Sequence, residues 1–585
     1  MAAAAHHCFL FIHRVLLMST PDWIVLCGTL SLILLYGIYR SRRHENLHSY
    51  LLGNRSLKWY QVGFSVMATQ ASAITFLSAP GQAYTDGMRF VEFYFGLPLA
   101  MIFLCVFFLP IYHRLKIFTA YEFLEQRFDL KTRTLTASLF LTQRGLAAGL
   151  TIYAPSIVLS SLLGWNIYWT NIFMGGLVIT YTMLGGTRAV SVTQVQQLMV
   201  IFAGMFLAAV MVVRLLPDGV GITDALQVAG KMGKANVITT QFSWNDRYNI
   251  WSGLIGGFFL ALAYFGTDQS QVGRYLAGKS IGESRLGLLM NGLLKIPMQF
   301  LILLIGALVF AFYQFQPAPV FFNTRQVTKV MNSEMADSFR MVNHQYDSIS
   351  LLKQQYAFQL LDGLKEDNDA QTAAVQESLQ ALDKEGKAIR SEAVALIKQA
   401  DPAADTNDTN YIFLTFVLTY LPKGLVGLLI AVVFCASWNS TAAELNSLAT
   451  TTVIDIYRRN INNKASQLHY VRVSMWATLG WGIFAIGVAQ LANQLGSLIE
   501  AVNVLGSLFY GNILGIFLIA FFLKKVTGSA VFIAAIITEI LVIGMYAADL
   551  VAFLWLNMIG CVAVMLLSWL LQQSGYFRGS TSASR

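Results

Sequence analysis

The stretch that decides the fold is Val62-Gly63-Phe64-Ser65-Val66-Met67-Ala68-Thr69-Gln70-Ala71-Ser72-Ala73-Ile74-Thr75-Phe76. It is apolar enough to lie in a bilayer, yet its centre carries small, hydroxyl and amide side chains instead of leucines. Carbonyls freed by a break in a membrane helix must line a cavity or bind something. The stretch therefore predicts a helix interrupted at mid-membrane, with backbone oxygens available to a cation. A close helix–helix contact is the alternative, because small residues also let two backbones approach.

The composition is that of a membrane protein that crosses the bilayer many times. Charged residues make up 12% of the chain and hydrophobic residues 56%, whereas a soluble domain has about 25% charged residues. Apolar runs of about twenty residues predict about thirteen transmembrane helices, so the lipid bilayer is an expected partner. The five cysteines are scattered singly, which suits neither a disulfide framework nor a zinc site. The net charge is +9, but the basic residues lie in short loops between apolar runs, so we expect no nucleic-acid partner.

The loop charges predict an orientation. Most Lys and Arg residues of the short loops fall on one side of the predicted spans, and this side is expected to be cytoplasmic. We therefore expect a cytoplasmic C-terminus and, across an odd number of spans, an outside N-terminus. The expected location is a plasma membrane, here the bacterial inner membrane.

Residues 317–410 interrupt the apolar pattern on the predicted outer side. The segment is polar, apolar positions recur at helical spacing in both halves, and a break near Asp367 predicts a helical hairpin. We favour a solvated extracytoplasmic insertion, because long insertions cost little stability; a docking platform for an extracytoplasmic partner is the alternative. Residues 1–18 are an N-terminal extension, to which we assign no role. They are either a signal peptide or lie upstream of the working start codon, which would then be that of Met18.

A second polar cluster, residues 436–447, lies inside a later apolar span. Ala436, Asn439 and Ser440 are spaced i, i+3, i+4 and share one helix face. Carbonyls of Ala68, Ala71 and Ala436 with the side-chain oxygens of Asn439 and Ser440 would supply five of the about five or six oxygens that Na⁺ needs. The alternative is that Ser and Thr bond back to their own helix.

A second interruption is predicted at residues 262–274, where aromatic residues and a glycine precede a polar run. Five spans separate it from the first, as expected for the first helices of two inverted repeats around a midplane site. Tyr264 could close over a solute as a gate, although an interfacial tyrosine is the commoner case.

Charged side chains within spans are functional candidates by default. Lys295 lies well inside an apolar run and could bind a solute, or pair with Glu92 or Glu444. No span holds a Ser/His/Asp or metal-ligand set, and no Walker loop is present, so we expect neither an enzyme nor an ATP-driven pump. The expected solute contacts are Thr75, Glu92, Tyr264, Phe265 and Lys295.

Several motifs in consistent order carry a family resemblance. They are Gly53-Asn54-Arg55-Ser56, Pro110-Ile111-Tyr112, residues 121–128 (YEFLEQRF), Ile152-Tyr153-Ala154-Pro155, residues 185–190 (GGTRAV), Thr267-Asp268-Gln269, Arg274-Tyr275-Leu276-Ala277 and Asp455-Ile456-Tyr457. With them the chain resembles the sodium:solute symporter family, which includes sodium/glucose, sodium/proline, sodium/iodide and sodium/monocarboxylate cotransporters. The resemblance implies an all-α LeuT-like fold of two inverted five-helix repeats, with one helix before and two after. The implied division is an N-terminal extension at 1–18, a leading helix at 19–45, and repeats at 55–247 and 248–522. Two additional transmembrane helices and a cytoplasmic tail follow at 523–585.

The resemblance also implies site residues. The family's conserved sodium site falls on the five residues named above, but members usually carry a hydroxyl where Asn439 stands. A second sodium site would need an acid where Gln194 stands and hydroxyls where Ala442 and Ala443 stand, so one sodium per solute is expected. Gln70, Tyr264 and Lys295 match positions of the sugar-transporting branch, so the resemblance implies Gln70 as a sixth solute contact. Residues 79–84 and 152–155 are more similar to the iodide and monocarboxylate branch.

These observations lead to one favoured hypothesis and two alternatives. The favoured hypothesis is a sodium-coupled symporter that imports a small polar solute, either a sugar or polyol or a small organic anion. A transporter-derived solute sensor and a proton-coupled symporter with Glu92 or Glu444 as carrier are the alternatives. The sequence carries no signal for an oligomeric state.

Overall fold

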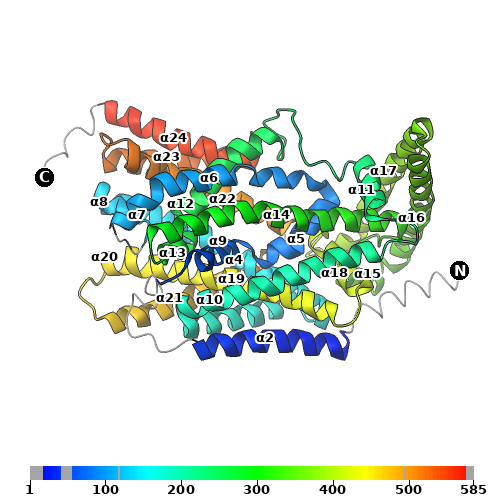
Figure 1. The fold of residues 1–585 in the computed structure, drawn as a ribbon, viewed down its shortest axis with the longest axis horizontal. Helices are drawn as coiled ribbons and strands as arrows, with labels where there is room; N and C mark the ends of the chain where they lie inside the picture. The colour runs from blue at the N-terminus through cyan, green and yellow to red at the C-terminus, as the bar shows by residue number, and fades with distance from the viewer. Residues whose placement is uncertain (1–17, 41–55, 116, 118, 493–494, 575–585) are drawn as a thin grey trace.

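The computed structural model describes residues 18–40, 56–115, 117, 119–492 and 495–574, without the side chains of residues 34, 37–40 and 184–192. The proposed extension at 1–18 thus lies outside the described residues except for Met18. Within these ranges the regular structure is helical, apart from one isolated bridge between Leu57 and Gly278. The apolar runs of the sequence fold as long helices that lie side by side (Figure 1).

The first half begins with a leading helix and then the interrupted pair. Its elements are α2 (Thr20–Arg40), α4 (Trp59–Gln70), α5 (Ala73–Asp86), η2 (Met88–Tyr94), α6 (Leu97–Phe103), η3 (Leu104–Phe108), α7 (Leu109–Leu115), α8 (Glu122–Arg127), α9 (Leu130–Leu163), α10 (Ile167–Arg214) and α11 (Ile222–Lys231). Helix α10 covers two predicted spans, at 165–185 and 190–214.

The second half repeats the pattern of a broken helix followed by long ones. Its elements up to the insertion are η4 (Ser252–Gly256), α12 (Gly257–Thr267), α13 (Gln269–Leu276), α14 (Ile281–Phe315), α15 (Thr324–Met331), α16 (Ala336–Lys365) and α17 (Asp369–Ala400). After it follow α18 (Thr409–Tyr420), α19 (Leu425–Thr451), η5 (Thr452–Tyr457), α20 (Arg458–Asn460), α21 (Gln467–Ala489), α22 (Leu498–Phe522), α23 (Gly528–Ala547) and α24 (Phe553–Gln573).

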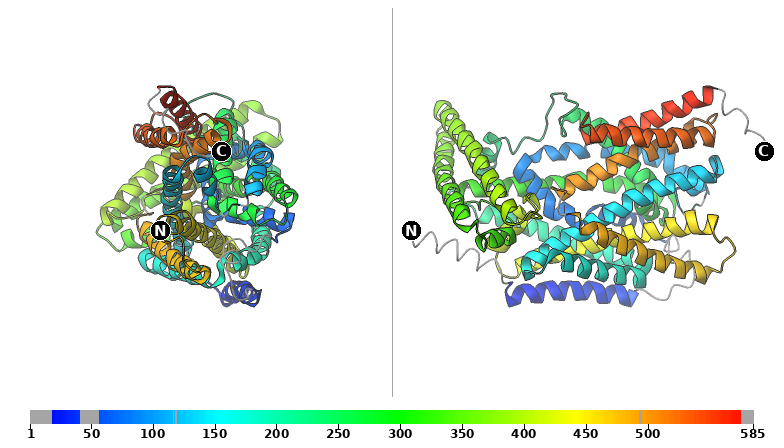
Figure 2. Two further views of the ribbon diagram at one scale, coloured as in Figure 1. Left: turned by 90° about the vertical axis from the view of Figure 1, so that its left-hand side faces the viewer. Right: turned by 180° about the vertical axis from the view of Figure 1, so that it is seen from behind.

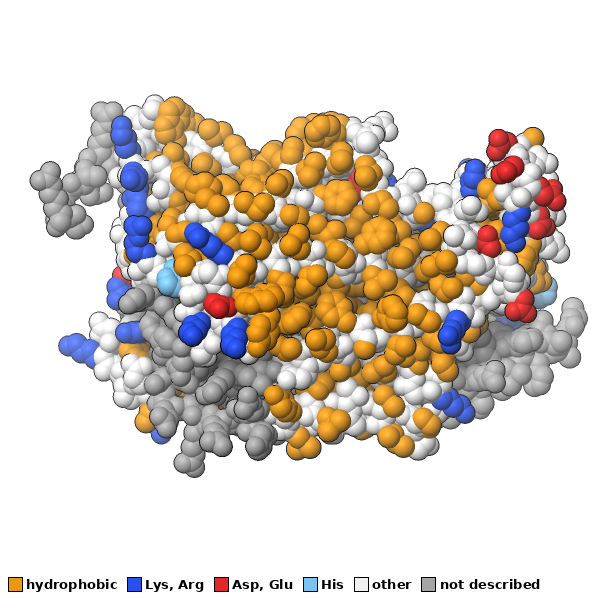
Figure 3. Space-filling model, viewed as in Figure 1, with side chains coloured by type: hydrophobic (Ala, Val, Ile, Leu, Met, Phe, Trp, Pro, Cys, Tyr) orange, Lys and Arg blue, Asp and Glu red, His pale blue; other side chains and the backbone are white. Residues whose placement is uncertain are grey.

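The surface identifies an integral membrane protein. Large apolar side chains remain on the outside of the helices, among them Leu293, Ile540 and Trp169, each about two-thirds exposed or more. In the described ranges nine helices are long and apolar enough to span a bilayer, or ten if the bent pair α4–α5 is counted. Figure 3 shows a broad apolar band between charged ends on the face it presents. Because no aqueous surface would expose so much apolar area, lipid must cover this band.

The insertion forms the predicted helical hairpin at one end of the molecule. Helices α16 and α17 pack against each other and are joined near Asp367, where the sequence predicts the break. Figures 1 and 2 show this hairpin beyond the ends of the long helices, at the end opposite to that where α24 finishes. Lys353 on α16 pairs with Asp383 on α17 at 3.0 Å. The hairpin is therefore held by its own contacts.

Close packing of α14 against the broken helix positions the site. Residues Gly63 of α4 and Gly287 of α14 face each other, and a Cβ added at Gly306 would lie 2.1 Å from the carbonyl oxygen of Pro80 in α5. Small residues allow membrane helices to approach this closely. As a result α14 contacts both halves of the interrupted helix.

Candidate functional site

The interruption predicted within 62–76 is confirmed. Helix α4 ends at Gln70 and α5 begins at Ala73, and the two axes are bent by 60°. Between them Ala71 (φ −81°, ψ 76°) and Ser72 (φ −80°, ψ 170°) leave the helical region. Small side chains at these positions add little packing that would hold the helix straight.

The break leaves two carbonyl oxygens without their usual helical partners. In a continuous helix the Ser72 N–H would donate to the Ala68 carbonyl; it donates instead to the Gln70 carbonyl, at 3.0 Å. The Thr75 N–H likewise donates to the Ser72 carbonyl, at 3.0 Å, and not to that of Ala71. Ala68 and Ala71 are the two residues of this stretch whose carbonyls the sequence assigns to sodium. Both are fully buried.

The other three predicted sodium residues lie on α19, which packs against α4 and α5. Ala436, Asn439 and Ser440 are all buried. The Ser440 hydroxyl donates back to the carbonyls of Ala436 at 3.0 Å and Ser437 at 3.2 Å, so the back-bonding alternative describes this side chain. The lone pairs of a hydroxyl that donates remain available to a cation. Both polar atoms of the Asn439 amide have no hydrogen-bond partner among the described residues.

Gln194 of α10 occupies the position where a second sodium site would need an acid. Its side-chain carbonyl accepts a hydrogen bond from the Ser65 hydroxyl at 2.6 Å, and its amide donates to the Thr69 hydroxyl at 3.4 Å. A neutral side chain that uses both its groups to hold α4 is poorly suited to a cation.

A central cavity of about 90 Å³ lies beside the break. Three of the six predicted solute contacts line it: Gln70, Thr75 and Tyr264. Thr69 and Ser72 also line it. The Gln70 side-chain carbonyl has no hydrogen-bond partner in the described part of the chain. The Tyr264 hydroxyl accepts a hydrogen bond from Gln271 at 2.6 Å, which fixes its position at the wall.

The other three predicted contacts lie outside this lining. Glu92 is buried and accepts a hydrogen bond from the Thr239 backbone N–H, at 2.5 Å, so it anchors the segment before η4. Phe265 is fully buried and packs edge-to-face on Tyr264 with ring centroids 4.9 Å apart. Lys295 reaches the cavity wall only indirectly, because its ammonium lies 5.7 Å from the ring centroid of Tyr94, which lines the cavity.

Lys295 belongs to a polar stripe on α14. Asn291, Lys295 and Gln299 follow each other at intervals of four residues, so they share one helix face. All three are completely buried, and none of their five side-chain nitrogen and oxygen atoms has a hydrogen-bond partner among the described residues. The ion pair of Lys295 with Glu92 or Glu444, our alternative for this lysine, is therefore not formed. The sequence analysis missed Asn291 and Gln299, although their spacing within an apolar run was visible.

Arg144 organises a buried charged cluster at the same cavity. Its guanidinium forms ion pairs with Asp268, at the break between α12 and α13, and with Glu444 of α19, the latter at 3.0 Å. The Tyr510 hydroxyl donates to Asp268 at 2.9 Å, and the Thr151 hydroxyl donates to Glu444 at 2.9 Å. The cluster thus joins α9, α19, α22 and the second broken helix. The Arg144 Nε atom has no acceptor among the described residues.

Comparisons with known proteins find similar transporters. A family model described as the sodium:solute symporter family matches residues 50–342 and 389–538. The sodium/sialic acid symporter SiaT of Proteus mirabilis (strain HI4320) is 25% identical over 93% of this chain and 93% of its own length. The human sodium-coupled monocarboxylate transporter 1 is 32% identical over 46% of this chain and 44% of its own.

A solved structure identifies the fold. The substrate-bound, outward-open state of a Na⁺-coupled sialic acid symporter superimposes with a TM-score of 0.73 at 23% identity, covering 95% of this chain and 98% of that one. The fold is the LeuT-like one. Residues 343–388, between the two matched family segments, fall within the hairpin α16–α17.

Proposed function

This chain belongs to the sodium:solute symporter family, and from that premise we propose that it imports one small organic anion with each sodium ion. It is a transporter and not an enzyme, and sodium is the ion of its family. The choice of an anionic solute and the one-to-one stoichiometry are our proposals.

The proposed sodium site joins the break to α19. The carbonyl oxygens of Ala68 and Ala71 do not accept hydrogen bonds from the backbone N–H groups that a continuous helix would supply. Helix α19 adds the carbonyl oxygen of Ala436 and the side-chain oxygens of Asn439 and Ser440. A buried amide without a partner costs about 1–3 kcal/mol. Coordination of the Asn439 side-chain oxygen by Na⁺ would remove part of that cost, and the hydroxyl of Ser440 would complete the set.

The proposal of an anion rests on one observation: the unused Nε–H donor of Arg144 at the central cavity. Guanidinium groups are well matched to carboxylates. Ser72 and Thr75 line the same cavity, and we assign their hydroxyls to the polar remainder of the solute. Relatives named for sialic acid and for monocarboxylates also support a solute with a carboxylate.

The charges of the cavity suggest how sodium and solute are coupled. Arg144 faces two carboxylates, those of Asp268 and Glu444, so the cluster carries one excess negative charge when both acids are ionised. An organic anion would be repelled there unless a cation binds nearby. Sodium at the break would supply that cation, and each ligand would then raise the affinity for the other by the same factor.

The orientation and the division of the chain remain proposals. Lys and Arg gather at the end opposite to the hairpin on the face shown in Figure 3, which favours a cytoplasmic location of that end. We therefore place the hairpin outside and the C-terminus in the cytoplasm of a bacterial inner membrane. The two repeats are proposed at 55–247 and 248–522.

Uptake into proteoliposomes tests the proposal. An inward sodium gradient should drive accumulation of labelled N-acetylneuraminate or lactate, while glucose serves as a neutral comparator. Replacing sodium with potassium should abolish accumulation. Sodium-independent uptake that follows a pH gradient would favour proton coupling, and sodium-dependent binding without counterflow would favour a sensor.

A further inference from the structure

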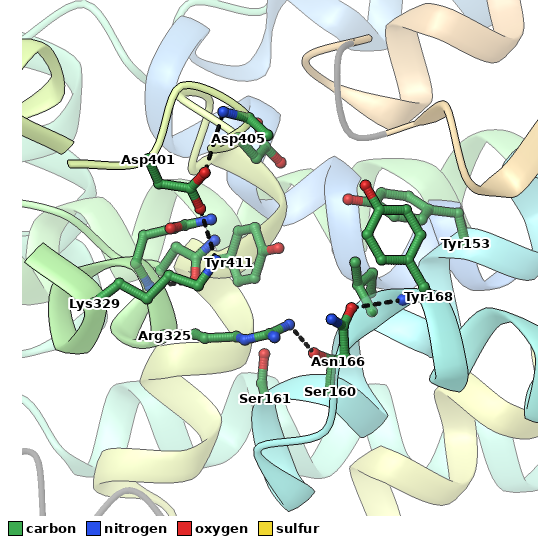
Figure 4. Close-up of a pocket in the computed structure, with 14 residues that line it drawn as sticks. Tyr153, Ser160, Ser161, Asn166, Tyr168, Arg325, Lys329, Asp401, Asp405 and Tyr411 are labelled. Carbon is green, nitrogen blue, oxygen red and sulfur yellow. Dashed lines mark hydrogen bonds and ion pairs between the residues drawn. The ribbon is translucent and has the colours of Figure 1, made fainter. Parts of the chain in front are cut away.

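A second, larger cavity lies where the insertion meets the membrane helices. It has a volume of about 210 Å³ and receives side chains from five segments: the end of α9 with Ser160, the start of α10 with Asn166, α15 with Arg325, the 401–405 segment with Asp405, and α18 with Tyr411 (Figure 4). More than half of its lining residues therefore come from segments that flank the hairpin.

This outer cavity is separate from the central one, although α9 lines both. Thr151 faces the central cavity and Tyr153 the outer one. Residues two apart on an α-helix point about 200° apart, that is, to opposite faces. The body of α9 thus stands between the two cavities, and an occupant of the outer cavity is not a solute on its way to Arg144.

The outer cavity holds an arginine without a carboxylate partner. The Arg325 guanidinium donates to the Ser160 hydroxyl at 3.0 Å, and no acid of the described residues lies within ion-pair distance of it. Figure 4 shows Arg325 extending from α15 across the cavity toward Ser160 and Ser161. At the rim Lys329 is neutralised by Asp401 at 2.6 Å. Arg325 is therefore the unpaired cation of this cavity.

The neighbouring groups define what else a ligand must offer. The side-chain carbonyl of Gln326 is buried and has no donor among the described residues. Asp405 is buried, and burial together with the charge of Asp408 raises its pKa to about 7, against an opposing hydrogen bond from the Asn407 backbone N–H. Near neutral pH this carboxyl is therefore protonated in part of the molecules, and its repulsion of an anion is reduced.

We propose that the outer cavity is a second binding site, which takes a small organic carboxylate that also carries a hydroxyl or amide N–H. The carboxylate binds Arg325 in the two-pronged geometry that guanidinium groups favour. The donor of the ligand binds the free carbonyl of Gln326. The occupant bridges α15 to the ends of α9 and α10, so it holds the insertion against the scaffold. None of the five proposed sodium ligands is among the residues that line this cavity, and binding there does not need sodium.

The test measures ligand-induced thermal stabilisation of the full-length purified protein in sodium-free potassium buffer. The probes are acetate, lactate, succinate, citrate and N-acetylneuraminate. At least one hydroxylated probe, but not acetate, should stabilise the protein, and Arg325→Gln should weaken its apparent affinity about ten-fold or more, as expected for loss of a charge-assisted pair. Arg340→Gln is the matched control, because Arg340 lies on α16 and pairs only with the exposed Asp337.

A second pair of measurements separates this site from the proposed transport site. The variant Gln70→Ala/Tyr264→Ala should keep the sodium-free response and lose any sodium-dependent response. Should Arg325→Gln fail to fold, Arg325→Lys takes its place, because it keeps the charge and loses the two-pronged geometry. The proposal is overturned if no probe stabilises the wild type without sodium, or if the Arg325 variant responds as the wild type does. A sodium-dependent response that the Gln70→Ala/Tyr264→Ala variant retains would overturn the proposed transport site and not this proposal.

Discussion

The proposed sodium site explains the environment of the Asn439 side chain only in part. It is buried, and neither its oxygen nor its nitrogen has a hydrogen-bond partner among the described residues. Its oxygen suits Na⁺, but its NH₂ group needs an acceptor that the described side chains do not provide. The proposed sodium site thus accounts for half of this side chain, and a water or a solute oxygen must satisfy the other half.

Ser440 provides a direct test of the sodium site. Ser440→Ala removes one oxygen from the proposed set of five and keeps the helix, because its hydroxyl bonds only to carbonyls of its own helix. We expect the sodium concentration for half-maximal uptake to rise about ten-fold, with little change in solute selectivity. Uptake measured against sodium concentration checks this. Ser447→Ala, two turns away and also back-bonded, should leave the sodium dependence unchanged.

Asp405 predicts how stability depends on pH. Burial raises its pKa from 3.8 to about 7 in the folded protein. Between these values the folded state keeps a proton that the unfolded chain has lost, so stability falls as pH rises from about 4 to 7. Asp405→Asn should therefore raise the melting temperature at pH 8 relative to wild type and leave it nearly unchanged at pH 4.

The control for Asp405 is Asp337→Asn, whose carboxylate is 94% exposed. It should show the same pH profile as the wild type. A wild-type profile for Asp405→Asn as well would mean that the Asp405 carboxyl is hydrated and ionised at neutral pH.

Residues that share one helix were predicted better than residues that meet from different helices. Ala436, Asn439 and Ser440 could be grouped from their spacing alone. Arg144 and its partners could not, because Asp268 lies 124 positions and Glu444 300 positions away along the chain. Each was visible as a charge within or beside an apolar run, but no periodicity pairs such residues.

Among the elements, the two interrupted helices were predictable because local sequence determines them. Weak packing at residues 68–73 and the polar run at 267–271 produce the breaks at Ala71–Ser72 and at Asp268. Pro422 lies between α18 and α19, where the chain leaves the helix because a proline cannot continue it. The roles of Glu92 and Phe265 were less predictable, because the direction of a side chain depends on the packing of its whole helix.

The polar stripe of α14 predicts a conflict between stability and function. A buried lysine without a hydrogen-bond or ion-pair partner among the described residues is costly in an apolar environment, so Lys295→Met should raise the melting temperature by several degrees. If the stripe meets water or solute during transport, the same change should reduce uptake at least several-fold. Lys279→Met, at an exposed lysine just before α14, should change neither property. A less stable protein with normal uptake would contradict this explanation of the stripe.

At the scale of the whole molecule, the fold was predictable because it repeats a simple rule. Long apolar runs become membrane helices, and two interrupted runs five spans apart place their breaks at the same depth. Helix α10 carries two predicted spans and turns between them, because the hydroxyls of Tyr181 and Thr193, twelve residues apart, lie within 2.8 Å of each other. The outer cavity could not be predicted, because it arises where the insertion happens to meet α9 and α10.

The charge carried per transport cycle follows from the proposed stoichiometry. One sodium ion and one monovalent organic anion move no net charge, whereas one sodium ion with a neutral polyol would move one. A membrane potential of 100 mV contributes about 2.3 kcal/mol per charge, or about fifty-fold accumulation. In proteoliposomes with a fixed sodium gradient, a valinomycin-induced inside-negative potential should therefore leave the steady-state accumulation of the monoanion unchanged. The chemical sodium gradient would be the whole driving force.

A control and a contradicting result are available in the same vesicles. Dissipating the sodium gradient with a sodium ionophore should abolish accumulation whether or not the potential is present. Accumulation that rises many-fold with the potential would mean that more than one sodium ion moves with the anion, or that the solute is neutral. The first case would require a second cation site despite Gln194, whose side chain already bonds Ser65 and Thr69. Gln194→Asp, which would place an acid at that position, should then lower the sodium concentration that half-maximal uptake requires.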